Sequence, residues 1–369
     1  MAGGEFPEYY GKGCIMGKTI ILTGGGTAGH VTPNLAIIPK LKEKGFHIEY
    51  IGTKDGMEKE IMTCTDVPYH TISAGKLRRY FSLKNFTDPI KLIAGWVKAG
   101  RLMKKLRPVA VFSKGGFVSV PVVFAAHQKK IPVVLHESDY TPGLANKLCI
   151  PRADKICVSF EPTLEFVPAG KGICTGLPIR HELLCGDKET GLSTCGFTGE
   201  KPVLLIMGGS LGAKALNEAV DAVLDELVKQ FDVIHIRGKN NLRSGFLPIG
   251  YKQFDFINCE LPHVYAAADI MVSRAGATAV FEILTLALPS LFVPLPKATS
   301  RGDQILNAKY FEKKGFSHVL EQEQLTAVTL MAGITRLYQE RDQLREKMQQ
   351  ENMIDSAEIV AQVIADAAR

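Results

Sequence analysis

The sequence predicts an α/β protein built from two Rossmann-like, doubly wound parallel-sheet domains that face each other across a cleft. Short apolar runs alternate with helical segments along the chain, as parallel sheets with crossover helices require. A strand, a glycine-rich turn and a helix follow one another twice, in "TIILTGGGTAGHVTPNLAII" and "VLLIMGGSLGAKALNEAV". The 369 residues also exceed the size, about 250 to 300 residues, at which a single hydrophobic core stops growing.

The first domain is expected over residues 16–177. Apolar runs bounded by turn residues predict its strands at 19–23, 47–52, 109–113, 132–136 and 155–159. Residues 1–15 precede a second methionine, and the "MGKTIILTGGG" that follows looks like a natural start. We therefore interpret residues 1–15 as a leader or a cloning scar outside the fold.

The second domain is expected over residues 178–353, after a junction rich in glycine and charge. Its strands are predicted at 202–208, 231–236, 254–257, 269–273 and 290–294. The last segment, residues 354–369, contains "DSAEIVAQVIADAAR", which starts with capping residues and has helical periodicity. We expect this helix to pack back onto the first domain.

Composition excludes several classes of protein. Hydrophobic residues make up 46% and charged residues 22% of the chain, which is typical of a globular protein rather than a disordered one. We find no apolar run of about 18 residues and no signal-peptide pattern, and expect a cytoplasmic protein. The eight cysteines form no C-x-x-C pair, so neither a zinc site nor a redox dithiol is indicated. The net charge of +6 suits an acidic partner.

The first glycine-rich turn matches the dinucleotide pattern G-x-G-x-x-G at Gly24, Gly26 and Gly29. A nicotinamide enzyme also needs an acid at the end of the second strand, whereas Glu49 lies within that strand. We therefore favour a turn that lets an anionic acceptor approach the backbone, with N–H groups from Gly29 onward facing its charge. His30, at the start of the following helix, is a candidate base; the alternative is a histidine that only bonds nearby backbone.

Seven motifs in order along the chain carry a family resemblance. They are "GGGTAGHVTPNLAI", "SKGGFVSVPVV", "HESDYTPGLANK", "GLPIR", "GGSLGAKALN", "SRAGATAVFEI" and "GDQILNAKYFEKKG". Together they resemble the MurG family of GT-B glycosyltransferases, which add N-acetylglucosamine from UDP-GlcNAc to a lipid-linked muramyl-pentapeptide in peptidoglycan synthesis. The resemblance implies a GT-B fold, an acceptor-binding first domain, a UDP-sugar-binding second domain, and an inverting hexosyltransferase that needs no metal and no cofactor.

The resemblance also implies donor-binding residues. A diphosphate would be met by an arginine and by a helix start, the ribose by a glutamate, uracil by a backbone group, and the sugar by polar side chains. The matching positions are Arg180, Ser210, Glu282, Ile257, Gln304 and Asp139. Two positions depart from the family pattern: Asp139 replaces a common asparagine, and Asp303 replaces the first of two adjacent glutamines.

An inverting transfer needs a base for the acceptor hydroxyl and a counter-charge for the departing UDP. His30 is the preferred base, and Glu137 in "HESD" is the competing candidate, because burial can raise the pKa of a carboxylate. The acceptor diphosphate is expected between two glycine turns, with Lys114 as an added cation. The acceptor-binding residues predicted there are Thr27, Gly29, Gly115 and Gly116.

A lipid acceptor requires the enzyme to dock on the cytoplasmic face of the cell membrane as a peripheral protein. Residues 76–107 mix basic and aromatic or aliphatic side chains, a composition that suits anionic headgroups and the bilayer interface. Within this segment, Lys76 to Arg107, the basic residues that we assign to the surface are Lys76, Arg78, Arg79, Lys84, Lys91, Lys98, Arg101, Lys104 and Lys105. An ordinary amphipathic helix is the alternative, and nucleic acid is disfavoured because no known binding motif occurs.

Three other functions remain open at this point. A UDP-sugar-dependent diacylglycerol glycosyltransferase would share the fold and the membrane surface. An enzyme resembling the UDP-GlcNAc 2-epimerases would share the two-lobed cleft but needs no membrane surface. A non-catalytic module would bind UDP-GlcNAc without releasing UDP when an acceptor is added.

Overall fold

The computed structural model describes residues 17–75, 88–209, 212–298, 300–351 and 355–368, so the proposed leader lies outside the described residues. The strands of the first half are β1 (Thr19–Thr23), β2 (His47–Thr53), β3 (Tyr69–Ile72), β4 (Ala110–Ser113), β5 (Val133–Glu137), β6 (Lys155–Val158) and β7 (Gly172–Cys174). Those of the second half are β8 (Val203–Met207), β9 (Asp232–Ile236), β10 (Tyr251–Phe254), β11 (Ile270–Ser273), β12 (Ser290–Phe292) and β13 (Ser317–Val319).

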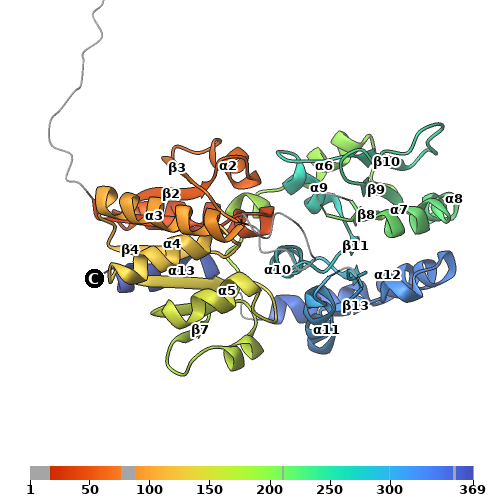
Figure 1. Ribbon diagram of the computed structural model, residues 1–369. Helices are drawn as coiled ribbons and strands as arrows, with labels where there is room; N and C mark the ends of the chain where they lie inside the picture. The colour runs from red at the N-terminus through yellow and green to blue at the C-terminus, as the bar shows by residue number, and fades with distance from the viewer. Residues whose placement is uncertain (1–16, 76–87, 210–211, 299, 352–354, 369) are drawn as a thin grey trace, which may run out of the picture.

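These strands form two separate parallel sheets, each at the centre of one lobe (Figure 1). The first sheet has the order β3-β2-β1-β4-β5-β6-β7, and the second has the order β10-β9-β8-β11-β12-β13. In each sheet the order reverses next to the first strand, between β1 and β4 and between β8 and β11. Ligands of such sheets bind outside the carboxyl ends of the strands at this reversal. The predicted fold of two doubly wound parallel-sheet domains is confirmed.

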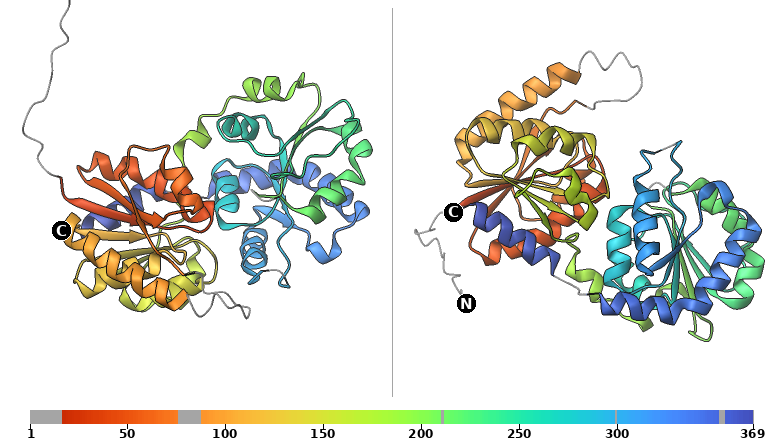
Figure 2. Two further views of the ribbon diagram at one scale, coloured as in Figure 1. Left: turned by 45° about the horizontal axis from the view of Figure 1, so that its top comes forward. Right: turned by 90° about the horizontal axis from the view of Figure 1, so that it is seen from below.

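Helices connect the strands and cover both faces of each sheet (Figure 2). In the first half they are α1 (Thr32–Glu43), α2 (Met57–Met62), α3 (Asp88–Leu106), α4 (Ser119–Gln128) and α5 (Leu144–Cys149). The later ones are α6 (Lys188–Cys195), α7 (Lys214–Asp221), α8 (Leu224–Gln230), α9 (Leu261–Ala267), α10 (Ala277–Thr285), α11 (Asp303–Lys314), α12 (Ala327–Gln350) and α13 (Ser356–Ala367). Within these residues, no helix combines the length and apolarity needed to cross a bilayer.

The sequence analysis missed three short strands, β3, β7 and β13, and each of them is an edge strand of its sheet. Most of their residues are only partly buried, and the sequences YHTI, GIC and SHV contain no continuous apolar run. The strand expected at 254–257 is also misplaced, because β10 ends at Phe254. Ile257 therefore lies in the loop between β10 and α9.

The last helix crosses back to the first lobe (Figure 2), where α13 packs against α1 and against β4, β5 and β6. Val360 and Ile364 are fully buried there in one cluster with Ile20 and Leu22. Two ion pairs hold the start of the helix, Lys44 to Glu358 at 2.6 Å and Lys40 to Asp355 at 3.4 Å. The chain thus passes between the lobes twice, before α6 and after α12.

Aromatic rings join the two lobes at the cleft. Tyr140 and Phe160 come from the loops that follow β5 and β6, and Phe281 and Tyr310 come from α10 and α11. The ring centroid of Phe160 lies 5.1 Å from that of Phe281 and 5.2 Å from that of Tyr310, and Tyr140 lies 6.0 Å from Tyr310. Such edge-to-face pairs add packing energy to the area they bury. The α10–α11 side of the second lobe is therefore held against the first.

Candidate active site

His30 lies at the reversal point of the first sheet, on the turn that follows β1. It ends a short 3-10 turn, Ala28–His30, and the α-helix begins two residues later at Thr32, with a proline in its first turn. The imidazole is half-buried, and its Nδ1 lies 2.9 Å from the hydroxyl of Thr27. Two of the predicted residues, Thr27 and His30, are therefore hydrogen-bonded to each other.

The two glycine turns of the first lobe meet, as expected from their positions after β1 and β4. The N–H of Gly25 donates to the carbonyl of Gly115 at 3.3 Å. A Cβ at Gly116 would lie 2.1 Å from the carbonyl oxygen of Gly25, and both Gly115 and Gly116 have positive φ, +100° and +84°. Only glycine permits this backbone and this close approach.

The amides of the first turn are less available to an anion than the sequence suggested. Gly26 donates its N–H to Glu58 at 3.1 Å, and the N–H groups of His30 and Val31 bond the carbonyls of Thr27 and Ala28. An acceptor diphosphate therefore has to be met by other groups of the cleft, in addition to amides that the turn leaves open.

Glu58 is a site-shaping residue that sequence reasoning missed. Its buried carboxylate accepts hydrogen bonds from the N–H of Thr53 at 3.1 Å and from the Thr53 hydroxyl at 2.5 Å, as well as from Gly26. These bonds hold the pKa of Glu58 below its usual value against the effect of burial, which raises it. The glycines of "GTKDGME" were the available signal, since a Cβ at Gly52 or Gly56 would collide with this network.

Two cations lie beside His30. Lys114 follows β4, is 1% exposed and donates to the hydroxyl of Ser138, while Arg301 approaches from the second lobe. Burial first, and then the charges of Lys114 and Arg301, lower the pKa of His30 to about 4. The imidazole is therefore neutral near pH 7, which is the state in which it can accept a proton.

Glu137, the competing base, is already fully engaged. Its carboxylate accepts hydrogen bonds from the N–H of Asp139 at 3.0 Å, from the N–H of Gly143 at 3.0 Å and from the side chain of Asn146 at 2.8 Å. It is 5% exposed. This bonding shapes the loop after β5 and leaves less room for a role in proton transfer.

Glu282 lies at the reversal point of the second sheet, on α10, which follows β11. It is buried, and the hydroxyl of Tyr265 donates to it at 3.3 Å. Burial raises the pKa of Glu282 to about 7, although the nearby charge of Arg180 opposes the shift. The Nε of Arg180 is itself buried without a hydrogen-bond partner among the described residues. Both groups therefore have bonding capacity that a ligand could use.

Gln304 and the two departures from the family pattern, which the resemblance assigns to the donor sugar, come from the loop after β5 and the start of α11. Gln304, at the start of α11, accepts a hydrogen bond from the N–H of Leu295 at 3.0 Å. Asp139 and Asp303 both pair with Arg301, at 3.1 Å and 2.6 Å. Burial, Glu137 and Asp303 together raise the pKa of Asp139 to about 6. Arg301 and Asn307, which also contacts Asp139, were not identified from the sequence.

Two further predicted donor-binding residues, Ser210 and Ile257, and the expectations about metal and cofactor remain. Ser210 lies outside the described residues. Ile257 is buried in its loop, where a backbone contact to a ligand remains a prediction. Among the residues that the structure describes, no group of three or more His, Cys, Asp or Glu side chains is arranged to hold a metal ion. The expectation that the protein needs no cofactor stays a prediction.

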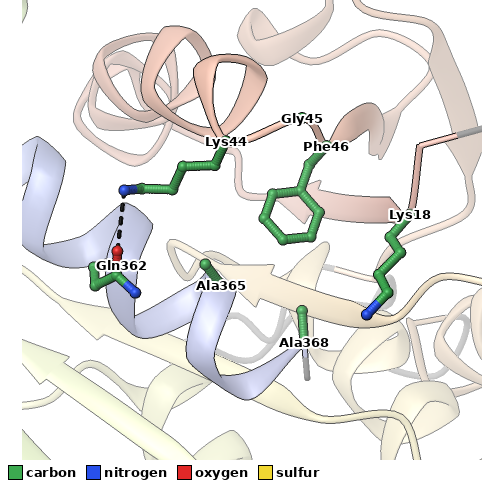
Figure 3. A pocket seen from close by; sticks show the side chains of 7 residues that line it. All are labelled: Lys18, Lys44, Gly45, Phe46, Gln362, Ala365 and Ala368. Atoms are coloured by element: carbon green, nitrogen blue, oxygen red, sulfur yellow. Dashed lines mark hydrogen bonds between the residues drawn. The ribbon is translucent and has the colours of Figure 1, made fainter.

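A separate cavity of about 390 Å³ lies away from this site (Figure 3). It is lined by Lys18, just before β1, by Lys44 and Phe46, and by Gln362 of α13, which bonds Lys44 at 3.0 Å. The cavity lies near the amino end of β1, whereas His30 follows its carboxyl end, so the two are at opposite ends of the strands. We assign it to the seam where α13 docks.

Comparison with known proteins agrees with this arrangement. The glycosyltransferase family 28 N-terminal domain matches residues 20–158, and the family 28 C-terminal domain matches residues 203–363. A Clostridium tetani protein is 53% identical over 90% of this chain and 93% of its own length. A Geobacillus kaustophilus protein is 52% identical over 96% of this chain and 100% of its own. Both are named UDP-N-acetylglucosamine–N-acetylmuramyl-(pentapeptide) pyrophosphoryl-undecaprenol N-acetylglucosamine transferase.

A solved structure shares the whole architecture. The crystal structure of Acinetobacter baumannii MurG aligns with a TM-score of 0.74 and 27% identity, over 95% of this chain and 99% of that one. A kitacinnamycin glycosyltransferase aligns with a TM-score of 0.72 at 15% identity, a likeness of fold alone. With both family domains matched in order and relatives half identical over nearly the full length, the chain belongs to glycosyltransferase family 28, and it has the GT-B fold of MurG.

Proposed function

We propose that this chain transfers N-acetylglucosamine from UDP-GlcNAc, with inversion, to a muramyl-pentapeptide linked through a diphosphate to undecaprenol, converting lipid I to lipid II. The names of the half-identical relatives support this donor and this acceptor. The observation that carries the proposal is the contact between the His30 turn and the start of α10. A Cβ at Gly29 would lie 3.1 Å from the hydroxyl of Thr278, so the turn that carries His30 lies against the start of α10 in the other lobe.

The reaction follows from this placement. Thr27 engages Nδ1 of His30, which leaves Nε2 to take the proton of the acceptor hydroxyl. The acceptor oxygen bonds the anomeric carbon as the bond from that carbon to the β-phosphate oxygen breaks, and UDP departs. Arg180 offsets the charge on the departing diphosphate, and Glu282 accepts hydrogen bonds from the ribose hydroxyls. Lys114 adds positive charge where the acceptor diphosphate would enter.

The test is an assay of UDP release with each acceptor in lipid vesicles. We expect release with UDP-GlcNAc and the diphosphate-linked muramyl-pentapeptide, and little with UDP-glucose or UDP-GalNAc. Release with diacylglycerol instead would favour the diacylglycerol glycosyltransferase. Conversion of UDP-GlcNAc to its C2 epimer, with no net release of UDP, would favour an enzyme resembling the 2-epimerases. Binding without any conversion or release would indicate a non-catalytic module.

We further propose that α3 docks the protein on an anionic membrane as a peripheral enzyme of the cytoplasmic face. Ile90, Ile93 and Val97, spaced by three and four residues, lie on one side of α3, and Ile90 and Ile93 are 68% and 59% exposed. A groove of about 590 Å³ beside this face is lined by Lys98, Arg101 and Lys105 among others. Residues 76–87 of the predicted surface lie outside the described residues.

Replacing Ile93 by glutamate should weaken binding to vesicles that contain anionic phospholipid, because it places a charge where an apolar side chain enters the interface. Co-sedimentation measures the loss, which we expect to be several-fold. Val328→Glu, at a position 78% exposed on α12, is the matched control and should bind like the unmodified protein. Equal binding by both variants would remove α3 from the docking surface.

A further inference from the structure

Arg301 bridges the two lobes at the sugar end of the cleft. It lies just before α11, in the second lobe, and its Nη2 contacts Asp139 of the first lobe at 3.1 Å. Its Nε contacts Asp303 of its own lobe at 2.6 Å. One guanidinium therefore bridges two carboxylates that come from different lobes, a geometry that its planar fork of donors suits.

Uncharged partners complete the same bridge. The side chain of Asn307 on α11 donates to Asp139 at 3.2 Å and accepts from the N–H of Tyr140 at 3.1 Å. The hydroxyl of Thr141 donates to Asp303 at 3.1 Å. The loop after β5 is thus joined to α11 and to Arg301 just before it by four polar contacts. We name this set, Asp139, Tyr140, Thr141, Arg301, Asp303 and Asn307, the interlobe clasp.

The clasp accounts for both departures from the family pattern. Asp139 and Asp303 alone would place two negative charges beside a donor that carries a diphosphate, and like charges at this range repel. The positive charge of Arg301 offsets part of this repulsion. Because both oxygens of Asp139 are engaged, one by Arg301 and one by Asn307, Asp139 is held as a part of the wall rather than as a free side chain.

We propose that Arg301 is a positioning residue for the donor sugar: it fixes the loop after β5 against α11, so that Gln304 and the first lobe form one wall of the sugar pocket. This inference rests on the proposed function, because it assigns the clasp to the GlcNAc end of the donor. The three charged members act as one unit, and the effect of replacing Arg301 depends on whether the two aspartates are present.

The experiment compares Arg301→Met, Arg301→Lys, the double variant Asp139→Asn/Asp303→Asn, and the triple variant that adds Arg301→Met to it. We measure KM for UDP-GlcNAc, kcat, and the affinities for UDP-GlcNAc and for UDP by calorimetry. Arg301→Met should raise the donor KM at least tenfold with a smaller change in kcat. Arg301→Lys should resemble it, because one ammonium cannot span both carboxylates in the same geometry.

The decisive comparison is between the triple and the double variant. If Arg301 acts through Asp139 and Asp303, the donor KM values of the double and triple variants should agree within threefold, because without the aspartates the arginine has no carboxylate left to hold. A further tenfold loss in the triple variant would overturn the proposal. Arg336→Met is the matched control, since Arg336 pairs with Glu340 at 2.9 Å on an exposed part of α12.

Calorimetry separates this inference from the proposed function. Arg301→Met should weaken UDP-GlcNAc but leave UDP within twofold, because the clasp adjoins the sugar and not the nucleotide. This result is expected even if the unmodified protein transfers sugar to a different acceptor, in which case only the acceptor assignment fails. Equal weakening of both ligands, or of neither, would show that Arg301 does not position the sugar.

Discussion

The two sides of the cleft differ in how their charged groups are satisfied. In the first lobe, Glu58 and Glu137 each accept three hydrogen bonds from the protein, and Lys114 donates to Ser138. In the second lobe, Glu282 has a single long hydrogen bond from Tyr265, and the Nε of Arg180 is buried without a partner among the described residues. The protein satisfies these groups of the first lobe, our proposed acceptor side, by itself, whereas those of the second lobe, our proposed donor side, leave bonds for a ligand to make.

The two kinds of carboxylate therefore have different roles: one kind holds loops in place, and the other can bind a ligand. A carboxylate with three donors is costly to disturb, so Glu58 and Glu137 hold loops in place. A buried carboxylate with one weak partner favours its neutral form, and a ligand that donates hydrogen bonds stabilises the charged one. We therefore expect substitutions on the acceptor side to change turnover or folding, and those on the donor side to change affinity.

The largest expected effect is that of His30→Ala. Loss of the base should reduce kcat by about 100-fold to 10,000-fold, the range for general base catalysis, with UDP-GlcNAc affinity within threefold of the unmodified protein. Steady-state kinetics and calorimetry measure the two quantities. Glu137→Gln is the comparison: it should lower the melting temperature more than His30→Ala does. Unchanged turnover in His30→Ala would return the role of base to Glu137.

The next effect is that of Glu282→Ala. Hydrogen bonds to a charged group contribute about 1.5 to 3 kcal/mol, so UDP and UDP-GlcNAc should both bind at least about tenfold more weakly, and by similar factors. Calorimetry measures both. The acceptor KM should not change, because our proposal assigns Glu282 to the donor. If UDP affinity stays the same, Glu282 does not contact the ribose, and the contrast between the lobes is lost.

The smallest expected effect is a dependence of uridine affinity on pH, which tests the same comparison between the lobes. The pKa of Glu282, raised to about 7 by burial, means that uridine should bind several-fold more tightly at pH 8 than at pH 6, as the carboxylate becomes ionised. Uridine serves as the probe because it has no phosphate to titrate, and Glu282→Gln should flatten the slope. For stability the sign is opposite: the contribution of Glu282 is present below its unfolded pKa, near 4.5, and is lost as pH rises towards 7.

Much of the fold was predictable because it depends on local patterns. The central strands β1, β4, β5, β8, β9 and β11 are buried on both faces, so each appears as an apolar run in the sequence. Strands β3, β7 and β13 were missed because most of their residues are only partly buried, so their sequences contain no continuous apolar run. Their pairing is decided by neighbouring strands far away in the chain.

The sequence by itself determined that two strand–glycine–helix turns occur, that a histidine follows the first, and which family the motifs resemble. These features depend on residues that are neighbours in the chain. Only the tertiary structure decided that Glu58 closes the first turn, that Glu137 is engaged by its own loop, and that Arg301 joins Asp139 to Asp303. Those contacts join residues up to 162 positions apart, and whether a buried charge binds, reacts or only holds a loop depends on the partners that folding brings to it.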